Sequence, residues 1–153
     1  MSGLLASFNT QDMALVAATA KTVIQIKAAT NQRVKILSWS VFFKDTVASD
    51  TPVEVQLIRQ STAIGGTPTA LTGIKMDTGM AETLQTTAAI YGTSPTEPTT
   101  TDVRKMLKVH PQSGYEVIYP YGQELILIGG GRVGIVMTAA QTQSVDVQID
   151  FEE

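Results

Sequence analysis

The residues best placed to form a cofactor site are the glycines between Gly129 and Gly134, which match the spacing G-x-G-x-x-G. In a dinucleotide-binding turn, these glycines are followed by a helix whose N-terminus binds the pyrophosphate. Here residues 133–138 (VGIVMT) have the alternation of a strand, and no βαβ unit surrounds them. The pattern therefore predicts a plain β-turn, and no cofactor is expected.

The chain has few of the histidine and cysteine side chains that most often act in catalysis. His110 is the only histidine, it stands in a turn beside Pro111, and the chain has no cysteine. A metal site of the cupin type needs several histidine and carboxylate ligands, and the G-x-S-x-G elbow of a serine hydrolase is absent. Without cysteine there is neither a disulfide framework nor a thiolate metal site. We predict that the protein is not an enzyme and holds no metal.

A row of carboxylates near the C-terminus is the other candidate for metal binding. Asp146, Asp150, Glu152 and Glu153 offer the oxygen ligands that calcium prefers. However, alternate residues of a strand share a face, and a row of outward acids is typical of a solvated face. No D-x-D-x-D-G loop accompanies them. The pattern favours a solvated strand face over a calcium site.

Four tyrosines are candidates for a binding surface: Tyr91, Tyr115, Tyr119 and Tyr121. Exposed aromatic rings stack on sugars in carbohydrate-binding modules. Tyrosine is equally common at strand edges and subunit contacts, where its ring is buried and its hydroxyl stays wet. We favour the second interpretation.

Composition excludes several classes of partner. The 153 residues fit one domain, and the net charge of −3 includes no run of basic residues. A nucleic-acid binder would carry a basic stripe, and a bilayer span would need about 20 apolar residues. The first residues lack the features of a signal peptide. Charged residues form only 16 % of the chain, against about 25 % in typical domains, so its surface suits large contacts with other subunits.

The elements that would position these residues are strands. Residues 144–152 alternate strictly between apolar and polar, and residues 132–140 alternate with two small or apolar faces. The short connector 141–143 predicts that these two strands pair as a hairpin that closes a sheet. In the longest candidate, 33–44, the phase changes near Ile36 and Leu37, which indicates a bulge or burial on both faces. Trp39 in this strand is expected in the core.

The remaining segments complete an all-β pattern. Further strands are expected at 21–28, 53–60, 83–91, 103–109, 115–122 and 124–128. Residues 1–20 are expected to form an N-terminal arm, and 61–79 and 92–102 to form long loops suited to contact a partner. The domain of 21–153 is then a single antiparallel β-sandwich of about eight strands. A jelly roll is the first choice, and an immunoglobulin-like sandwich the second.

Three segments carry a family resemblance: 119–125 (YPYGQEL), 129–135 (GGGRVGI) and the strand ending at 150–153 (DFEE). Over about the last 40 residues, this pattern resembles the small jelly-roll decoration or cement proteins of tailed-bacteriophage heads. The resemblance implies a homotrimer that binds the major capsid protein on the outside of the head. It also implies a virion protein that is assembled in the host cytoplasm. From the composition, we expect neither a nucleic acid nor a membrane as a partner.

The residues that would form the oligomer or capsid interface come from two strands. They are Val34, Ile36, Phe42, Tyr115, Tyr119 and Tyr121. Burying an apolar side chain of this size is worth roughly 1.5–3 kcal/mol, so an outward face bearing them would favour association. Two alternatives remain open: a carbohydrate- or receptor-binding module of a fibre or adhesin, and an internal assembly or neck protein of the same virion.

Overall fold

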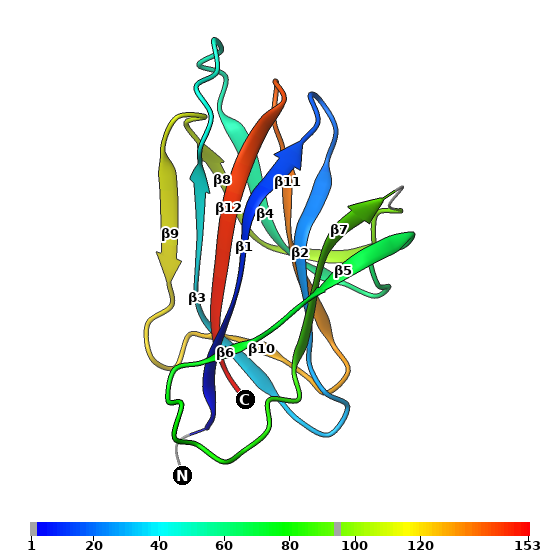
Figure 1. Cartoon of the computed structure of the whole chain (residues 1–153), viewed down its shortest axis with the longest axis vertical. Helices are drawn as coiled ribbons and strands as arrows, with labels where there is room; N and C mark the ends of the chain where they lie inside the picture. The colour runs from blue at the N-terminus through cyan, green and yellow to red at the C-terminus, as the bar shows by residue number, and fades with distance from the viewer. Residues whose placement is uncertain (1–2, 94–95) are drawn as a thin grey trace.

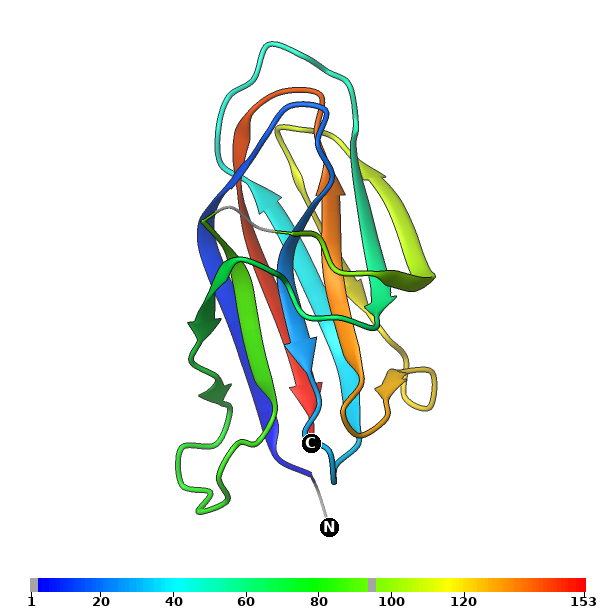
Figure 2. The same cartoon turned by 90° about the vertical axis from the view of Figure 1, so that its right-hand side faces the viewer.

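The protein is an antiparallel β-sandwich, as the sequence predicts. The computed structural model describes residues 3–93 and 96–153, and within these ranges it contains twelve strands and no helix. The strands form two sheets that pack face to face (Figures 1 and 2), and β1 begins beside the end of β12, where Leu4 and Glu153 exchange backbone hydrogen bonds.

Each sheet has six strands. In sheet A the order is β10 (Leu125–Leu127), β3 (Val34–Phe43), β12 (Gln143–Glu152), β1 (Leu5–Leu15) and β6 (Ile74–Lys75), and β9 (Gly114–Ile118) also pairs with β3. In sheet B the order is β5 (Thr67–Leu71), β7 (Thr87–Thr93), β2 (Lys21–Lys27), β11 (Arg132–Thr138), β4 (Val53–Gln60) and β8 (Thr100–Val109).

The strand order shows how the chain winds. β9 and β10 pair with successive parts of β3, so they act as one strand position interrupted at residues 119–124. With that position counted once, an inner set runs β9/β10-β3-β12-β1 in sheet A and β2-β11-β4-β8 in sheet B. β1 and β2, β3 and β4, and β11 and β12 each lie in opposite sheets. From this interleaving we infer a jelly-roll core, with β5, β6 and β7 added at its side.

Two sequence-based expectations about the chain ends are wrong. The strands at 132–138 and 143–152 do not pair as a hairpin, because β11 lies in sheet B and β12 in sheet A. Residues 5–15 are not an arm: β1 pairs with β12 from Leu5 opposite Glu152 to Leu15 opposite Gln143. The ring of Phe8 stacks on that of Phe151, with centroids 5.3 Å apart. The sequence did not predict this strand for two reasons. Many of its residues are small or polar, and the bulge between Thr10 and Met13 breaks the regular alternation of its inward side chains.

The two expected loops also contain strands. Within 61–79 the chain forms β5 and β6, which pair with β7 and β1. The expected loop 92–102 includes the end of β7 and the start of β8, and its residues 94–95 lie outside the described residues, as do residues 1–2 of the expected arm. Threonine accounts for part of the difference, since its β-branched side chain suits a strand as well as a loop.

The change of phase in β3 is a β-bulge, one of the two options that the sequence left open. Asp150 and Phe151 are consecutive on β12, yet they pair with Ser38 and Ile36, so Leu37 is the extra residue. Before the bulge, Ile36 points into the core, and after it Trp39 does. This bulge decides which side chains of β3 remain outside.

The core is built from the alternation that the sequence shows. Val145, Val147, Ile149 and Phe151 are at most 2 % exposed, while the polar residues between them are less buried. β11 lies between β2 and β4, as its two apolar or small faces indicated; Val133, Ile135 and Met137 are fully buried, whereas Arg132, Val136 and Thr138 on its other face are partly buried. Trp39 is 1 % exposed, which confirms its place in the core.

The outer face of sheet B carries a buried polar layer. Gln25 Nε2 donates to Gln60 Oε1 (2.6 Å), and Gln60 Nε2 donates to Thr22 Oγ1 (3.0 Å). Thr22 Oγ1 in turn donates to the carboxylate of Glu97 (2.7 Å). A Cβ at Gly134 would lie 2.5 Å from Gln60 Oε1. A side chain at this position would force the Gln60 amide out of this hydrogen-bonded layer.

Candidate interaction surface

The most prominent apolar feature of the surface lies on the outer face of sheet A. Leu5 is 41 % exposed, Met76 54 % and Ile118 69 %. All three border one open groove of 280 Å³. The other residues that line this groove are Ala6, Leu37, Ser38, Tyr119, Asp150 and Phe151. We call this set the sheet A patch.

Three local features place the patch there. The bulge in β3 turns both Leu37 and Ser38 toward the groove, and Tyr119 N donates to the Leu37 carbonyl (2.9 Å). β9 ends at Ile118, shortly before Pro120, which cannot donate to the ladder. On the far side, Met76 N donates to the Leu5 carbonyl (2.9 Å), which brings the segment after β6 to the first residue of β1.

Asp150 lies at the base of the groove and is held by neutral donors. Its carboxylate accepts hydrogen bonds from Ser38 Oγ (2.7 Å) and from Gln148 Nε2 (2.9 Å). Nearby, Lys35 donates to Glu152 (3.0 Å), and Gly3 N donates to the same carboxylate (2.9 Å). The hydrogen bond from Lys35, together with that from Gly3, holds the pKa of Glu152 below its ordinary value. The groove therefore combines exposed apolar side chains with one hydrogen-bonded carboxylate, and the Lys35–Glu152 ion pair lies outside it.

Phe42 extends the apolar surface along the same face. It is 51 % exposed and lines a smaller hollow of 140 Å³ with Ser40 and Gln148. Its ring lies over Gly114 of β9, where a Cβ would collide with it. Glycine at the start of β9 thus leaves the space that the Phe42 ring occupies.

The structure divides the six residues that the sequence proposed as an interface. Val34 and Ile36 are fully buried, so their assignment to an outward face is wrong: the bulge at Leu37 reverses the phase that this assignment assumed. Phe42 and Tyr115 are about half exposed, at 51 % and 50 %. Tyr119 is partly buried and its hydroxyl accepts a hydrogen bond from Trp39 Nε1 (3.3 Å).

Tyr121 is the most exposed of these residues, at 98 %. It lies in the turn that interrupts β9 and β10, in which Gln123 N donates to the Pro120 carbonyl (2.9 Å). Gly122 follows it with φ of +84°, the conformation that a type II turn needs at this position. Tyr115, Tyr119 and Tyr121 thus differ in environment and do not form one exposed row.

Leu5, Met76 and Ile118 were not among the residues predicted from the sequence. Sequence patterns place Leu5 in an arm and Met76 in a loop, and the approach of these segments depends on pairing between distant parts of the chain. Ile118 carried a usable signal, since it alternates with Val117, which packs against the core. An apolar residue at a position that alternation places on the outer face of a strand is a sequence signal for a surface contact.

The described residues hold no group of three or more histidine, cysteine or acidic side chains arranged to bind a metal. His110 lies 3.6 Å from Asp50, and both side chains are at least half exposed. The glycines at 129–131 form a turn, with Gly130 at φ +76°. They lead into strand β11, at the position where a dinucleotide-binding turn needs a helix.

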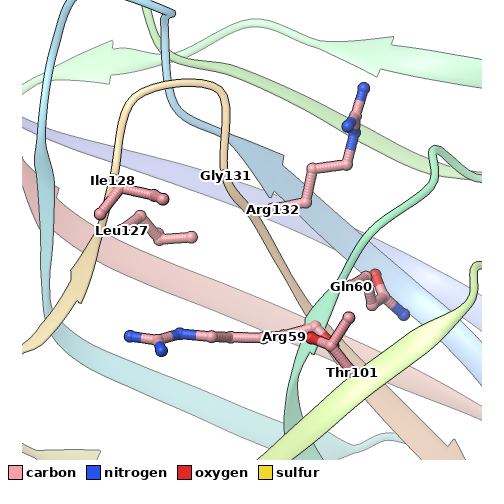
Figure 3. Close-up of a pocket in the computed structure, with 7 residues that line it drawn as sticks. All are labelled: Arg59, Gln60, Thr101, Leu127, Ile128, Gly131 and Arg132. Atoms are coloured by element: carbon pink, nitrogen blue, oxygen red, sulfur yellow. The ribbon is translucent and has the colours of Figure 1, made fainter.

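A second pocket, of 180 Å³, opens between the ends of the two sheets (Figure 3). It is lined by Arg59, Gln60, Thr101, Leu127, Ile128, Gly131 and Arg132. Arg59 reaches across to sheet A and donates to the Ile126 carbonyl (2.9 Å). In Figure 3 its side chain runs beneath Leu127 and Ile128, whereas that of Arg132 points the other way. The two guanidinium groups do not converge on one ligand position.

Comparison with known proteins gave no match to any family model, curated protein or solved structure. Within the described residues, the chain has no helix of the length and apolarity needed to cross a membrane.

Proposed function

We propose that this protein is a structural virion protein of a tailed bacteriophage that attaches to the outside of the head through the sheet A patch. The observation that carries the proposal is the clustering of Leu5, Met76 and Ile118 around one groove on a rigid sheet. Contiguous exposed apolar side chains with a polar border are typical of protein–protein contacts. The family resemblance in residues 119–153 supplies the specific partner, the major capsid protein.

The free energy gained by burying the apolar side chains of the sheet A patch favours attachment to a partner protein. Complete burial of one such side chain is worth roughly 1.5–3 kcal/mol, and a few anchors of this kind dominate most interfaces. Because β3, β9 and β12 hold the groove by paired backbone, little conformational entropy is lost when a partner binds.

The proposed assembly is a homotrimer. Phe42 and Tyr115, both half exposed beside the edge formed by β9, are the residues we assign to contacts between copies. This assignment keeps the sheet A patch free for the capsid.

The proposal is tested with Ile118→Glu and Met76→Glu, which place charge on the patch, and with Val16→Glu as a control. Val16 is 46 % exposed and lies outside the groove. Sedimentation with empty phage heads should recover the natural protein and the control variant but neither patch variant. Light scattering should give a trimer for all four proteins. Equal binding of the patch variants to heads, or a monomer for the natural protein, would overturn the proposal.

Tyr121 favours a second candidate, a carbohydrate- or receptor-binding module. A fully exposed aromatic ring on a rigid turn is suited to stack on a sugar. A glycan screen with Tyr121→Ala as the matched variant separates the two functions. Glycan binding that depends on Tyr121, without binding to heads, would favour the module.

A further inference from the structure

The longest free strand edge in the described structure belongs to β8. It is the last strand of sheet B, it spans ten residues, and it pairs with β4 on one side alone. The other described edges are shorter or interrupted. β1 pairs with β6 only at Ala6 and Ser7, and the free remainder of its edge contains the bulge between Thr10 and Met13. β5 has five residues, β6 has two, and the position shared by β9 and β10 is interrupted by a turn that contains Pro120. A row of free backbone N–H and C=O groups is a template for another strand.

Positive charge is concentrated along this edge. Arg104, Lys105 and Lys108 belong to β8, and Arg59 and Arg132 line the pocket at the start of the strand. Only the three on β8 lie on the edge itself, in a chain with eleven basic residues and a net charge of −3; Arg59 belongs to β4 and Arg132 to β11. Two acids lie among them. Asp102 is 3.9 Å from Arg59 and 3.8 Å from Arg104, and Glu54 is the cross-strand neighbour of Lys108.

The outer side of the same strand is apolar. Lys105 pairs with Leu57 and Val103 with Ile58, so Arg104 is an extra residue in β8. This bulge brings Val103 and Met106 onto one face, and they are 46 % and 52 % exposed. An added strand would therefore find apolar side chains to cover as well as backbone to pair with.

We infer that the β8 edge binds an extended acidic segment of a partner protein by strand addition. The charge on the edge selects this occupant. Two copies of β8 placed side by side would bring the cations of both together, which disfavours self-pairing. Lys105 is opposite Leu57 and Lys108 is opposite Glu54, so these two lysines face opposite sides of the sheet. A segment with glutamate or aspartate at alternate positions meets Lys105 and the adjacent Arg104 on one side, while the residues between them meet Val103 and Met106 on the other and its backbone completes the ladder. This surface is separate from the sheet A patch, so the inference does not depend on the proposed attachment to a capsid.

The test uses the full chain and a fluorescent peptide of about ten residues in which glutamate alternates with valine or threonine, the length of β8. Anisotropy should show binding that weakens steeply between about 50 and 300 mM salt, because the attraction is electrostatic. Deuterium exchange should slow at amides of β8. A peptide with lysine in place of glutamate should not bind.

Two further comparisons separate strand addition from general attraction between charges. The acidic peptide with alternate backbone amides methylated keeps its charge but cannot pair, and it should lose binding. The variant Arg104→Glu/Lys105→Glu should bind the acidic peptide at least about tenfold more weakly, and Arg33→Glu, an exposed change outside this edge, should bind it normally. No binding by the acidic peptide, equal binding by the methylated peptide, or protection at sheet A instead of β8 would overturn the inference.

Discussion

The indole Nε1 of Trp39 donates a hydrogen bond to the hydroxyl of Tyr119, 3.3 Å away, and so joins the centre of the core to the end of β9. Trp39 is 1 % exposed, which leaves its N–H no access to solvent. Tyr119, which the sequence suggested as an interface residue, thus has a structural role that does not depend on a partner.

We predict that Tyr119→Phe lowers the free energy of unfolding by about 1–3 kcal/mol, the cost of leaving a buried donor unsatisfied. Urea denaturation followed by Trp39 fluorescence measures it. Tyr121→Phe is the control. Because Tyr121 is 98 % exposed, this variant should have the same free energy of unfolding as the natural protein. If both variants were equally stable, the hydrogen bond from Trp39 would contribute nothing.

Phe8 tests the finding that residues 5–15 belong to the core. Phe8→Ala removes the ring stacked on Phe151 and should cost about 3–5 kcal/mol, as is usual for a buried phenylalanine. Leu5→Ala, in the same strand but 41 % exposed, should cost less than about 1 kcal/mol. Thermal and urea unfolding give both values. A mobile arm would predict small and equal effects.

Gly134 tests the polar layer on sheet B. Gly134→Ala places a methyl group against Gln60 and Thr22, and we expect it to destabilise the fold by about 1–3 kcal/mol through overpacking. Gly79→Ala serves as the comparison, since the nearest atom to its added Cβ would be Asp77 Oδ1 at 3.2 Å, on an exposed side chain. Calorimetry should show a lower melting temperature for the first variant alone. A neutral Gly134→Ala would mean that the Gln60 amide moves freely.

Glu152 should make stability depend on pH. The hydrogen bonds from Lys35 and Gly3 lower the pKa of Glu152 in the folded state, so the folded chain holds this proton less tightly than the unfolded chain does. The resulting stability is present above about pH 4.3, the usual pKa of glutamate, and is lost as the pH falls through the lower folded pKa.

Glu152→Gln should therefore be less stable than the natural protein at neutral pH, and the difference should disappear in acid. The effect should be small, because the Lys35 side chain is 45 % exposed and the ion pair is screened. Urea midpoints measured from pH 7 to pH 3 check the trend. A difference that stays constant with pH would assign the effect to packing instead of charge. The hydrogen bond with Glu152 also raises the pKa of Lys35, so its own contribution fades in strong alkali.

Local patterns in the chain were enough to predict the fold class and most of the strands. The alternation in residues 144–152 identified the buried face of β12 without ambiguity, because a period of two places every second side chain in the core. Three further features could be predicted because each depends on neighbouring residues: the glycine turn at 129–131, the core position of Trp39 and the irregularity near Leu37.

Long-range packing alone settled which strands share a sheet and which side chains stay outside. The connector 141–143 suits a hairpin or a crossing between sheets equally well, and packing selected the crossing. One extra residue, Leu37, moved Ile36 into the core and Ser38 to the surface. The sheet A patch unites Leu5, Met76 and Ile118, which lie far apart in the chain. The basic edge at β8 likewise depends on sheet order, because no local pattern states which strand has one neighbour.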